Sequence, residues 1–187
     1  MPTHVALLRG INVGGGGKVP MAELRELVTS LGHGDVSTYI QTGNIIFTPS
    51  HDDTAALAAE LHAAITAAFG VRSGVVVLSR AELASVVDAN PYAAEPVLKF
   101  VHGVFLPAEP DGATHESVAA AVQRAAAKGG RDEATIIGRT LYLHTPDGFG
   151  TSDLARELLT KNRRGPLAAG TARNWATVNK LLALCEA

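Results

Sequence analysis

A glycine run near the amino terminus is flanked by residues that could bind an anion. Positions 14–17 are four consecutive glycines, Lys18 follows them, and Arg9 and Asn12 precede them. Glycine lets the backbone approach a ligand closely, the two cations supply charge, and the Asn12 amide can orient a bound oxygen. Pro20 suits the first position of a helix, whose unpaired N–H groups would favour the same ligands. These residue types predict a phosphate or carboxylate site.

A second polar segment, at positions 41–44, is expected beside the glycine run. It forms the tip between two predicted strands, and in a β-α-β-β-α-β domain this tip and the loop after the first strand share one sheet edge. A basic, polar turn near the carboxy terminus could add a third side. The predicted ligand-binding residues are Arg9, Asn12, Gly14, Gly15, Lys18, Gln41, Thr42, Asn44, Arg173, Asn174 and Thr177.

Known nucleotide and catalytic motifs do not match these residues. A P-loop would place a glycine where Asn12 stands and a hydroxyl where Val19 stands. The seven histidines and the single cysteine, Cys185, show no metal-ligand spacing, so no metal site is predicted. No nucleophile elbow is present, and the sequence names no cofactor. The plain alternative is a turn whose glycines relieve strain.

Two other functions remain open. An enzyme could use the same cleft, although Lys18 and Tyr39 do not form a set that specifies a reaction. An interaction module could contact RNA or an acidic protein through a basic carboxy-terminal segment. This segment holds five of the sixteen lysines and arginines: Lys161, Arg163, Arg164, Arg173 and Lys180. The alternative for its charges is a solvated face beside a core tryptophan.

The hydrophobic spacing predicts which elements position the first loops. Strands are expected at 5–8, 36–41, 45–48 and 75–78. A helix should begin at Pro20 and stop at Gly32, and another should be capped by Asp52 or Asp53 and end at Gly70. The resulting order is the β-α-β-β-α-β, ferredoxin-like pattern.

The rest of the chain is expected to start a similar order. Ser79 and Glu82 are spaced as a capping box for a third helix, and 93–96 forms a linker. Strands are predicted at 100–106, 134–137 and 140–144, with a helix capped by Thr114 between the first two. Two helices, 152–160 and 171–184, finish the chain, the second capped by Thr171. The prediction is an α+β protein with a ferredoxin-like subdomain at 1–80, a helix and linker at 81–98, and a second α+β subdomain at 99–187.

Composition narrows the class of protein. The chain has 187 residues, of which 47% are hydrophobic, and a formal net charge of −2. This charge disfavours nucleic acid and anionic membranes as general partners. One cysteine fits a reducing compartment, and no secretory signal or membrane-length apolar run is present. A cytoplasmic protein without membrane contact is expected, and its oligomeric state is left open.

Several motifs resemble the bacterial family called domain of unknown function 1697. They are Leu7–Gly15, Thr38–Asn44 before Ile45-Ile46-Phe47, Asn90-Pro91-Tyr92, Tyr142-Leu143-His144 and Thr171–Val178, with Met21 and Leu24 on the first helix. The family often has serine in place of Thr42, phenylalanine in place of Tyr92 and a second residue type in the glycine run. These changes keep hydroxyl, bulk and flexibility. The resemblance implies a two-subdomain α+β protein with ferredoxin-like parts and no established activity.

Overall fold

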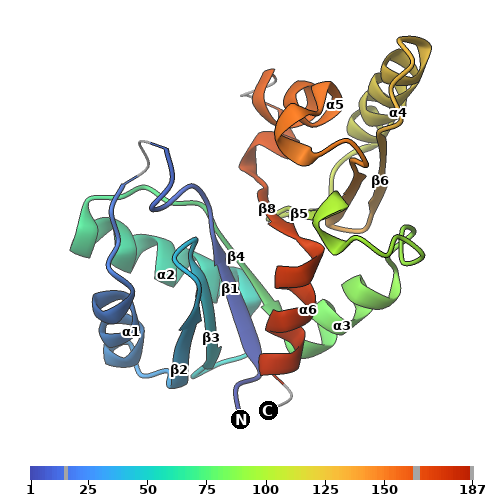
Figure 1. Cartoon of the computed structure of the whole chain (residues 1–187). Helices are drawn as coiled ribbons and strands as arrows, with labels where there is room; N and C mark the ends of the chain where they lie inside the picture. The colour runs from blue at the N-terminus through green and yellow to red at the C-terminus, as the bar shows by residue number, and fades with distance from the viewer. Residues whose placement is uncertain (15–16, 162–164, 186–187) are drawn as a thin grey trace. The chain divides into compact units, whose positions relative to one another are not determined.

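The computed structural model describes residues 1–14, 17–161 and 165–185, which form two compact units (Figure 1). Unit 1 comprises Met1–Val87 together with the chain from Asn179 onward, and unit 2 comprises Asp88–Val178. The predicted order of elements in the first unit and the α+β fold class are confirmed. None of the helices in the described residues has the length and apolar character needed to cross a membrane.

Unit 1 contains one antiparallel sheet in the order β2-β3-β1-β4. Its elements are β1 (His4–Leu8), α1 (Met21–Ser30), β2 (Gly34–Tyr39), β3 (Asn44–Thr48), α2 (Thr54–Phe69), β4 (Val75–Ser79) and α3 (Arg80–Asp88). β1 lies in the centre, where Leu7 pairs with Asn44 on one side and with Val76 on the other. The loops after β1, between β2 and β3, and before β4 therefore share one edge.

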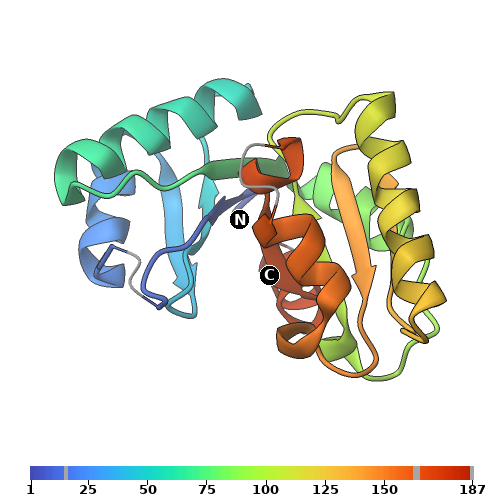
Figure 2. The ribbon, with the colours of Figure 1, turned by 90° about the horizontal axis from the view of Figure 1, so that it is seen from above.

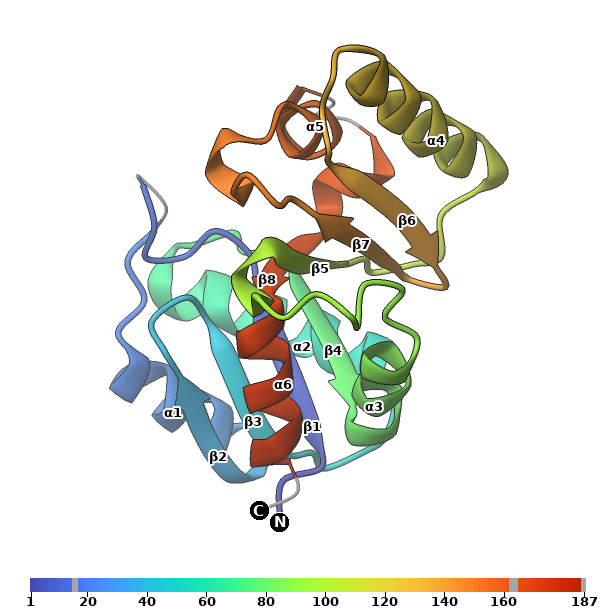
Figure 3. The ribbon, with the colours of Figure 1, turned by 45° about the vertical axis from the view of Figure 1, so that its right-hand side comes forward.

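Helices α1 and α2 cover one face of this sheet (Figure 3). Alternate residues of the central strands, Ala6, Leu8, Ile45 and Phe47 among them, enter the core under these helices. Asp53 caps α2 by accepting hydrogen bonds from the N–H groups of Ala55 and Ala56, and Gly70 ends the helix in the left-handed region. The core thus fixes the ends of the strands from which the loops of this edge emerge.

Unit 2 has the same sheet order as unit 1. Its sheet runs β6-β7-β5-β8, so β5, β6, β7 and β8 take the positions of β1, β2, β3 and β4. The elements are the 3-10 helix η1 (Leu98–Phe100), β5 (Val101–Phe105), α4 (Gly112–Ala127), β6 (Glu133–Ile137), β7 (Thr140–His144), the 3-10 helix η2 (Phe149–Thr151), α5 (Asp153–Arg156), the π-helix η3 (Glu157–Lys161), the 3-10 helix η4 (Pro166–Ala169) and β8 (Thr171–Asn174). The last helix, α6 (Trp175–Leu184), begins in unit 2 and belongs to unit 1 from Asn179 onward. Figure 2 shows α4, in yellow, running alongside the strands of this sheet.

The capping box predicted for α3 is present. The Ser79 backbone N–H donates to Glu82 Oε2 at 2.8 Å, and the Glu82 backbone N–H donates to Ser79 Oγ at 3.2 Å. By contrast, the cap predicted for α4 is wrong. Asp111 rather than Thr114 caps this helix, because Asp111 Oδ1 accepts hydrogen bonds from both the N–H and the hydroxyl of Thr114.

The predicted carboxy-terminal helices also differ from the structure. The helix expected at 152–160 is a short α5 followed by a π-helical turn. The helix expected from Thr171 begins only at Trp175, because Thr171–Asn174 instead pairs with β5 as strand β8. The helical spacing of apolar residues in 175–184 made the predicted helix start too early. The strand at 171–174 is only four residues long, and so short a segment gives no clear strand pattern in the sequence.

His102, on β5, generates a prediction for unit 2. Its ring stacks on Phe149 with ring centroids 4.0 Å apart, and its buried Nδ1 has no hydrogen-bond partner among the described residues. Burial lowers the pKa of His102 to about 4. Since this lies below the unfolded value of about 6.5, the unfolded state binds the extra proton between these pH values. The contribution of His102 to the free energy of unfolding is therefore fully present above pH 6.5 and is lost as the pH falls towards 4.

We expect acidification from pH 6.5 to 4 to remove roughly 3 kcal/mol of the free energy of unfolding through His102. His102→Phe keeps an aromatic ring against Phe149 and should remove that part of the acid dependence. Urea denaturation followed by fluorescence of Trp175, the chain's single tryptophan and a residue of unit 2, measures this. His115→Gln, at an exposed position on α4, is the control and should keep the wild-type dependence. Equal acid sensitivity of His102→Phe and wild type would contradict the assignment.

Candidate functional site

Three loops meet at the end of β1, as the strand order requires. The Leu8 N–H donates to Gly43 O at 2.8 Å, which places the β2–β3 tip on one side. The Arg9 N–H donates to Gly74 O at 2.9 Å, which places the loop before β4 on the other side. The loop after β1 runs between them to α1. The candidate site is this sheet edge of unit 1.

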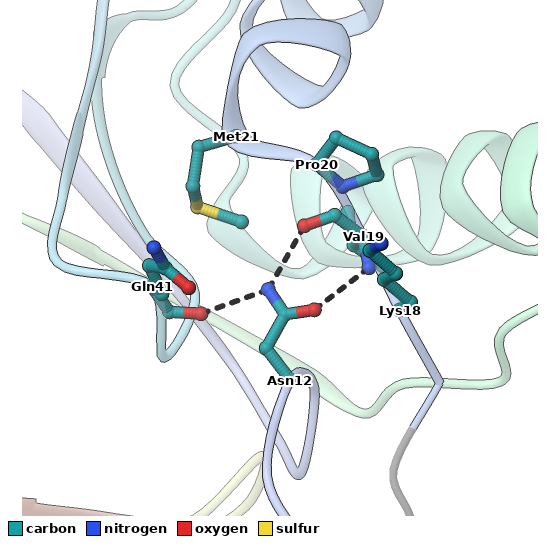
Figure 4. A pocket seen from close by; sticks show the side chains of 6 residues that line it. All are labelled: Asn12, Lys18, Val19, Pro20, Met21 and Gln41. Atoms are coloured by element: carbon teal, nitrogen blue, oxygen red, sulfur yellow. Dashed lines mark hydrogen bonds between the residues drawn. The ribbon is translucent and has the colours of Figure 1, made fainter.

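The Asn12 side chain clips two of these loops together (Figure 4). Its Nδ2 donates to Val19 O at 2.8 Å and to Gln41 O at 3.0 Å, while its Oδ1 accepts from the Val19 N–H at 2.8 Å. Both amide hydrogens are thus used by backbone carbonyls. Asn12 has a φ of 54°, in the left-handed region that asparagine tolerates better than most residues. Its role is to position the loops.

A pocket of about 450 Å³ opens between the start of α1 and the β2–β3 tip. Its lining residues are Asn12, Lys18, Val19, Pro20, Met21 and Gln41. Three of the predicted site residues, Asn12, Lys18 and Gln41, are therefore brought together. Sequence reasoning missed Val19, Pro20 and Met21 as lining residues, although their place between the glycine run and the helix was a usable signal.

Positive charge is concentrated in the loops of this edge. Segments 9–20, 40–43 and 70–74 contain Arg9, Lys18 and Arg72 but no aspartate or glutamate. Lys18 is exposed, and the described residues offer its ammonium no hydrogen-bond or ion-pair partner. In a chain with a net charge of −2, this local excess of cations favours an anion.

The first turn of α1 lies at the pocket. Pro20 occupies the N-cap position without making a side-chain cap, and the first helical hydrogen bond runs from the Leu24 N–H to Pro20 O at 3.0 Å. The N–H groups of Met21, Ala22 and Glu23 therefore precede the first helical hydrogen bond. Glu23 in the same turn offsets part of the helix dipole, so Lys18 is the larger source of attraction.

The other predicted residues of unit 1 that the structure describes do not line the pocket. Asn44 is fully buried, and its Nδ2 donates to Tyr39 O at 2.9 Å and to Thr42 Oγ1 at 3.3 Å, which holds the tip in shape. Gly14 is exposed with a φ of 42°, and Gly15 lies outside the described residues. Arg9 is exposed, on the β4 side of β1.

Ser73 joins Arg9 to a histidine that sequence reasoning did not place here. Its buried hydroxyl donates to Arg9 O at 2.9 Å and accepts from the Arg9 N–H at 3.0 Å. The Ser73 carbonyl lies 2.6 Å from Nδ1 of His62, on α2. Because a carbonyl can only accept, Nδ1 carries the hydrogen, and the neutral ring has its lone pair on Nε2. The Ser73 carbonyl thus orients the His62 imidazole at the same loop edge.

Arg173, Asn174 and Thr177 belong to unit 2, so their predicted part in a site of unit 1 stays a prediction. Arg173 is buried on β8, where Nη1 donates to Thr171 Oγ1 at 2.9 Å and to Ala172 O at 2.8 Å. Burial lowers the pKa of Arg173 to about 10. Asn174 Oδ1 accepts from the Thr177 N–H at 2.9 Å, so Asn174 caps α6 in place of Thr171. Of the basic segment, Arg163 and Arg164 lie outside the described residues.

A second polar cluster in unit 2 unites two motifs of the sequence. The ring of Tyr92 stacks on His144 with centroids 5.3 Å apart, and His144 Nε2 lies 2.8 Å from Glu95 Oε2. Glu133 Oε2 is 3.6 Å from the other ring nitrogen. With both nitrogens facing carboxylates, His144 holds the 92–95 segment against β7. Across the described residues, no group of histidine, cysteine, aspartate and glutamate is arranged to hold a metal ion.

Replacing Asn12 should loosen the loop edge of unit 1. Asn12→Ala removes three hydrogen bonds and puts alanine at a positive φ, which together cost about 2–4 kcal/mol of the free energy of unfolding. Asn12→Gly loses the same bonds but accepts the backbone angle, so it should cost about 1 kcal/mol less. Circular dichroism in urea follows the unfolding of both units, and Trp175 fluorescence reports unit 2 as the internal control. A shift of the first signal without a shift of the second therefore belongs to unit 1. If Asn12→Gly were as stable as wild type, the three Asn12 hydrogen bonds would not stabilise unit 1, and this prediction would be wrong.

We expect that Gly17 cannot be replaced even by alanine without a loss of stability. A Cβ at this position would lie 2.8 Å from Val71 Cγ1 and closer still to Cγ2, so Gly17→Ala should destabilise unit 1 by about 1–3 kcal/mol through overpacking. Val71→Ala in the same chain removes both methyl groups and should recover part of this loss. Thermal denaturation of the two single variants and the double variant tests the contact. Additive losses in the double variant would show that the two residues do not meet.

Comparisons with known proteins agree with this fold. The conserved bacterial protein SP0830 from Streptococcus pneumoniae has a similar structure, with a TM-score of 0.73, 23% sequence identity and 98% of each chain covered. At this identity the likeness concerns the fold. Curated proteins give no match. The family model described as a protein of unknown function, DUF1697, matches residues 1–142. The chain therefore belongs to the DUF1697 family.

Proposed function

We propose that this protein binds a small anionic ligand, bearing a phosphate or carboxylate group, in the pocket beside Lys18. The observation that carries the proposal is that Lys18, which is exposed and has no partner for its ammonium among the described residues, lines a preformed pocket of about 450 Å³. Pockets of this size are typical of sites for small organic molecules. The absence of carboxylates from the three loop sequences means that an entering anion meets no like charge from them.

The hydrogen bonds of the Asn12 side chain preorganise the proposed site. Asn12 fixes the backbone on either side of the pocket through Val19 and Gln41, so these walls need not order when a ligand arrives. A preformed site loses less conformational entropy on binding. Asn12 therefore contributes by holding Lys18 and Gln41 at a fixed separation, while Lys18 supplies the charge.

Charge removal at Lys18 tests the proposal. Lys18→Met keeps most of the side-chain length and should weaken binding of an anion by about tenfold, as expected for a hydrogen bond to a charged group. Isothermal titration of wild type with inorganic phosphate, ribose 5-phosphate and citrate supplies the probes. At least one should bind, and its affinity should fall as salt is raised.

Lys99→Met is the matched control, because it removes the same charge from unit 2 and should leave binding unchanged. If none of the three anions binds wild type more tightly than it binds Lys18→Met, the proposed function is wrong.

A further inference from the structure

We infer that the ligand of this pocket is a purine nucleoside monophosphate, with its phosphate at Lys18 and its base between Met21 and Gln41. This inference rests on the proposed anion binding and specifies the rest of the ligand. The pocket is roughly fifteen times the volume of one water molecule in the liquid. A phosphate ion alone would leave most of that space to solvent, so the ligand should extend beyond its charged group.

The wall nearest α1 is apolar. Val19, Pro20 and Met21 line it, and Figure 4 shows the Met21 thioether reaching into the space between Gln41 and Val19. Methionine sulfur makes favourable contacts with aromatic rings, and its flexible chain adapts to a flat surface. The proline ring beside it adds a rigid apolar face. This wall suits a planar aromatic group better than a second charged or sugar group.

Gln41 supplies the polar edge that a base requires. Its backbone carbonyl is held by Asn12, while its exposed side-chain amide has no partner among the described residues. A glutamine amide presents one acceptor and two donors, which match the N6 and N7 edge of adenine in a bidentate pair. Since the Asn12 hydrogen bond fixes the Gln41 backbone, the Gln41 side chain leaves the β2–β3 tip from a fixed position.

Lys18 also lines the pocket, and Figure 4 shows it on the other side of Asn12 from Gln41, two residues before Pro20 at the N-cap of α1. A phosphate there would meet one ammonium and, at most, the three backbone N–H groups of Met21, Ala22 and Glu23, which precede the first helical hydrogen bond. This arrangement fits a terminal monophosphate. We take the free mononucleotide as the ligand, since a chain with a net charge of −2 is poorly suited to follow a polynucleotide backbone.

Isothermal titration with AMP, ribose 5-phosphate, adenosine and a 5′-phosphorylated oligoadenylate tests the inference on the full chain. AMP should bind at least about tenfold more tightly than ribose 5-phosphate, the discrimination expected of one bidentate amide–base pair. Gln41→Leu keeps the backbone carbonyl that Asn12 needs and should lower AMP affinity towards the ribose 5-phosphate level, because only the contacts of the base with the apolar wall remain. The same variant should leave ribose 5-phosphate affinity unchanged, whereas Lys18→Met should weaken both.

The outcomes separate this inference from the proposed function. Equal affinity for AMP and ribose 5-phosphate, with a loss in Lys18→Met, would overturn the nucleotide assignment and leave anion binding in place. Equal affinity for AMP and adenosine would overturn anion binding at Lys18. Tighter binding of the oligoadenylate than of AMP would overturn the choice of a free mononucleotide. No binding by any probe here, together with binding of citrate in the earlier titration, would overturn the nucleotide assignment alone.

Discussion

The pocket of unit 1 depends on one side chain that joins two loops far apart in sequence. Asn12 donates to the carbonyls of Val19 and Gln41 and accepts from the Val19 N–H. Its amide thus joins the backbones of two loops by hydrogen bonds beyond the end of the sheet. The Asn12 N–H also donates to Gly17 O at 3.1 Å, so these two residues, which flank most of the glycine run, lie side by side. Without the amide, the start of α1 and the β2–β3 tip would be connected mainly through the sheet below them.

The sequence predicts the parts of the structure that depend on short-range patterns. The strand and helix order of unit 1 follows from apolar spacing and from Pro20 and Gly70, and the capping box at Ser79 and Glu82 is a local signal. The meeting of the loops at the end of β1 follows from the strand order. That Asn12 and Gln41 come together was therefore predictable, as their contact is a consequence of topology.

What could not be predicted depends on partners distant in sequence. Nothing near Thr171 indicates a strand, because β8 exists only through its pairing with β5 some seventy residues earlier. Likewise, an asparagine beside glycines is equally consistent with a ligand contact and with a backbone clip, and only the positions of Val19 and Gln41 decide between them. The link from His62 through Ser73 to Arg9 crosses three elements and has no signature in the sequence.

The pairing of β8 with β5 has a consequence for how the chain folds during synthesis. The four strands of the first sheet are all made once Ser79 has left the ribosome, whereas the central strand of the second sheet waits for Thr171–Asn174 before both of its edges are paired. Chains are made at roughly 5–20 residues per second, so β5 keeps an open edge for several seconds. Exposed strand edges recruit other chains, and this interval is when unit 2 is most open to misassembly.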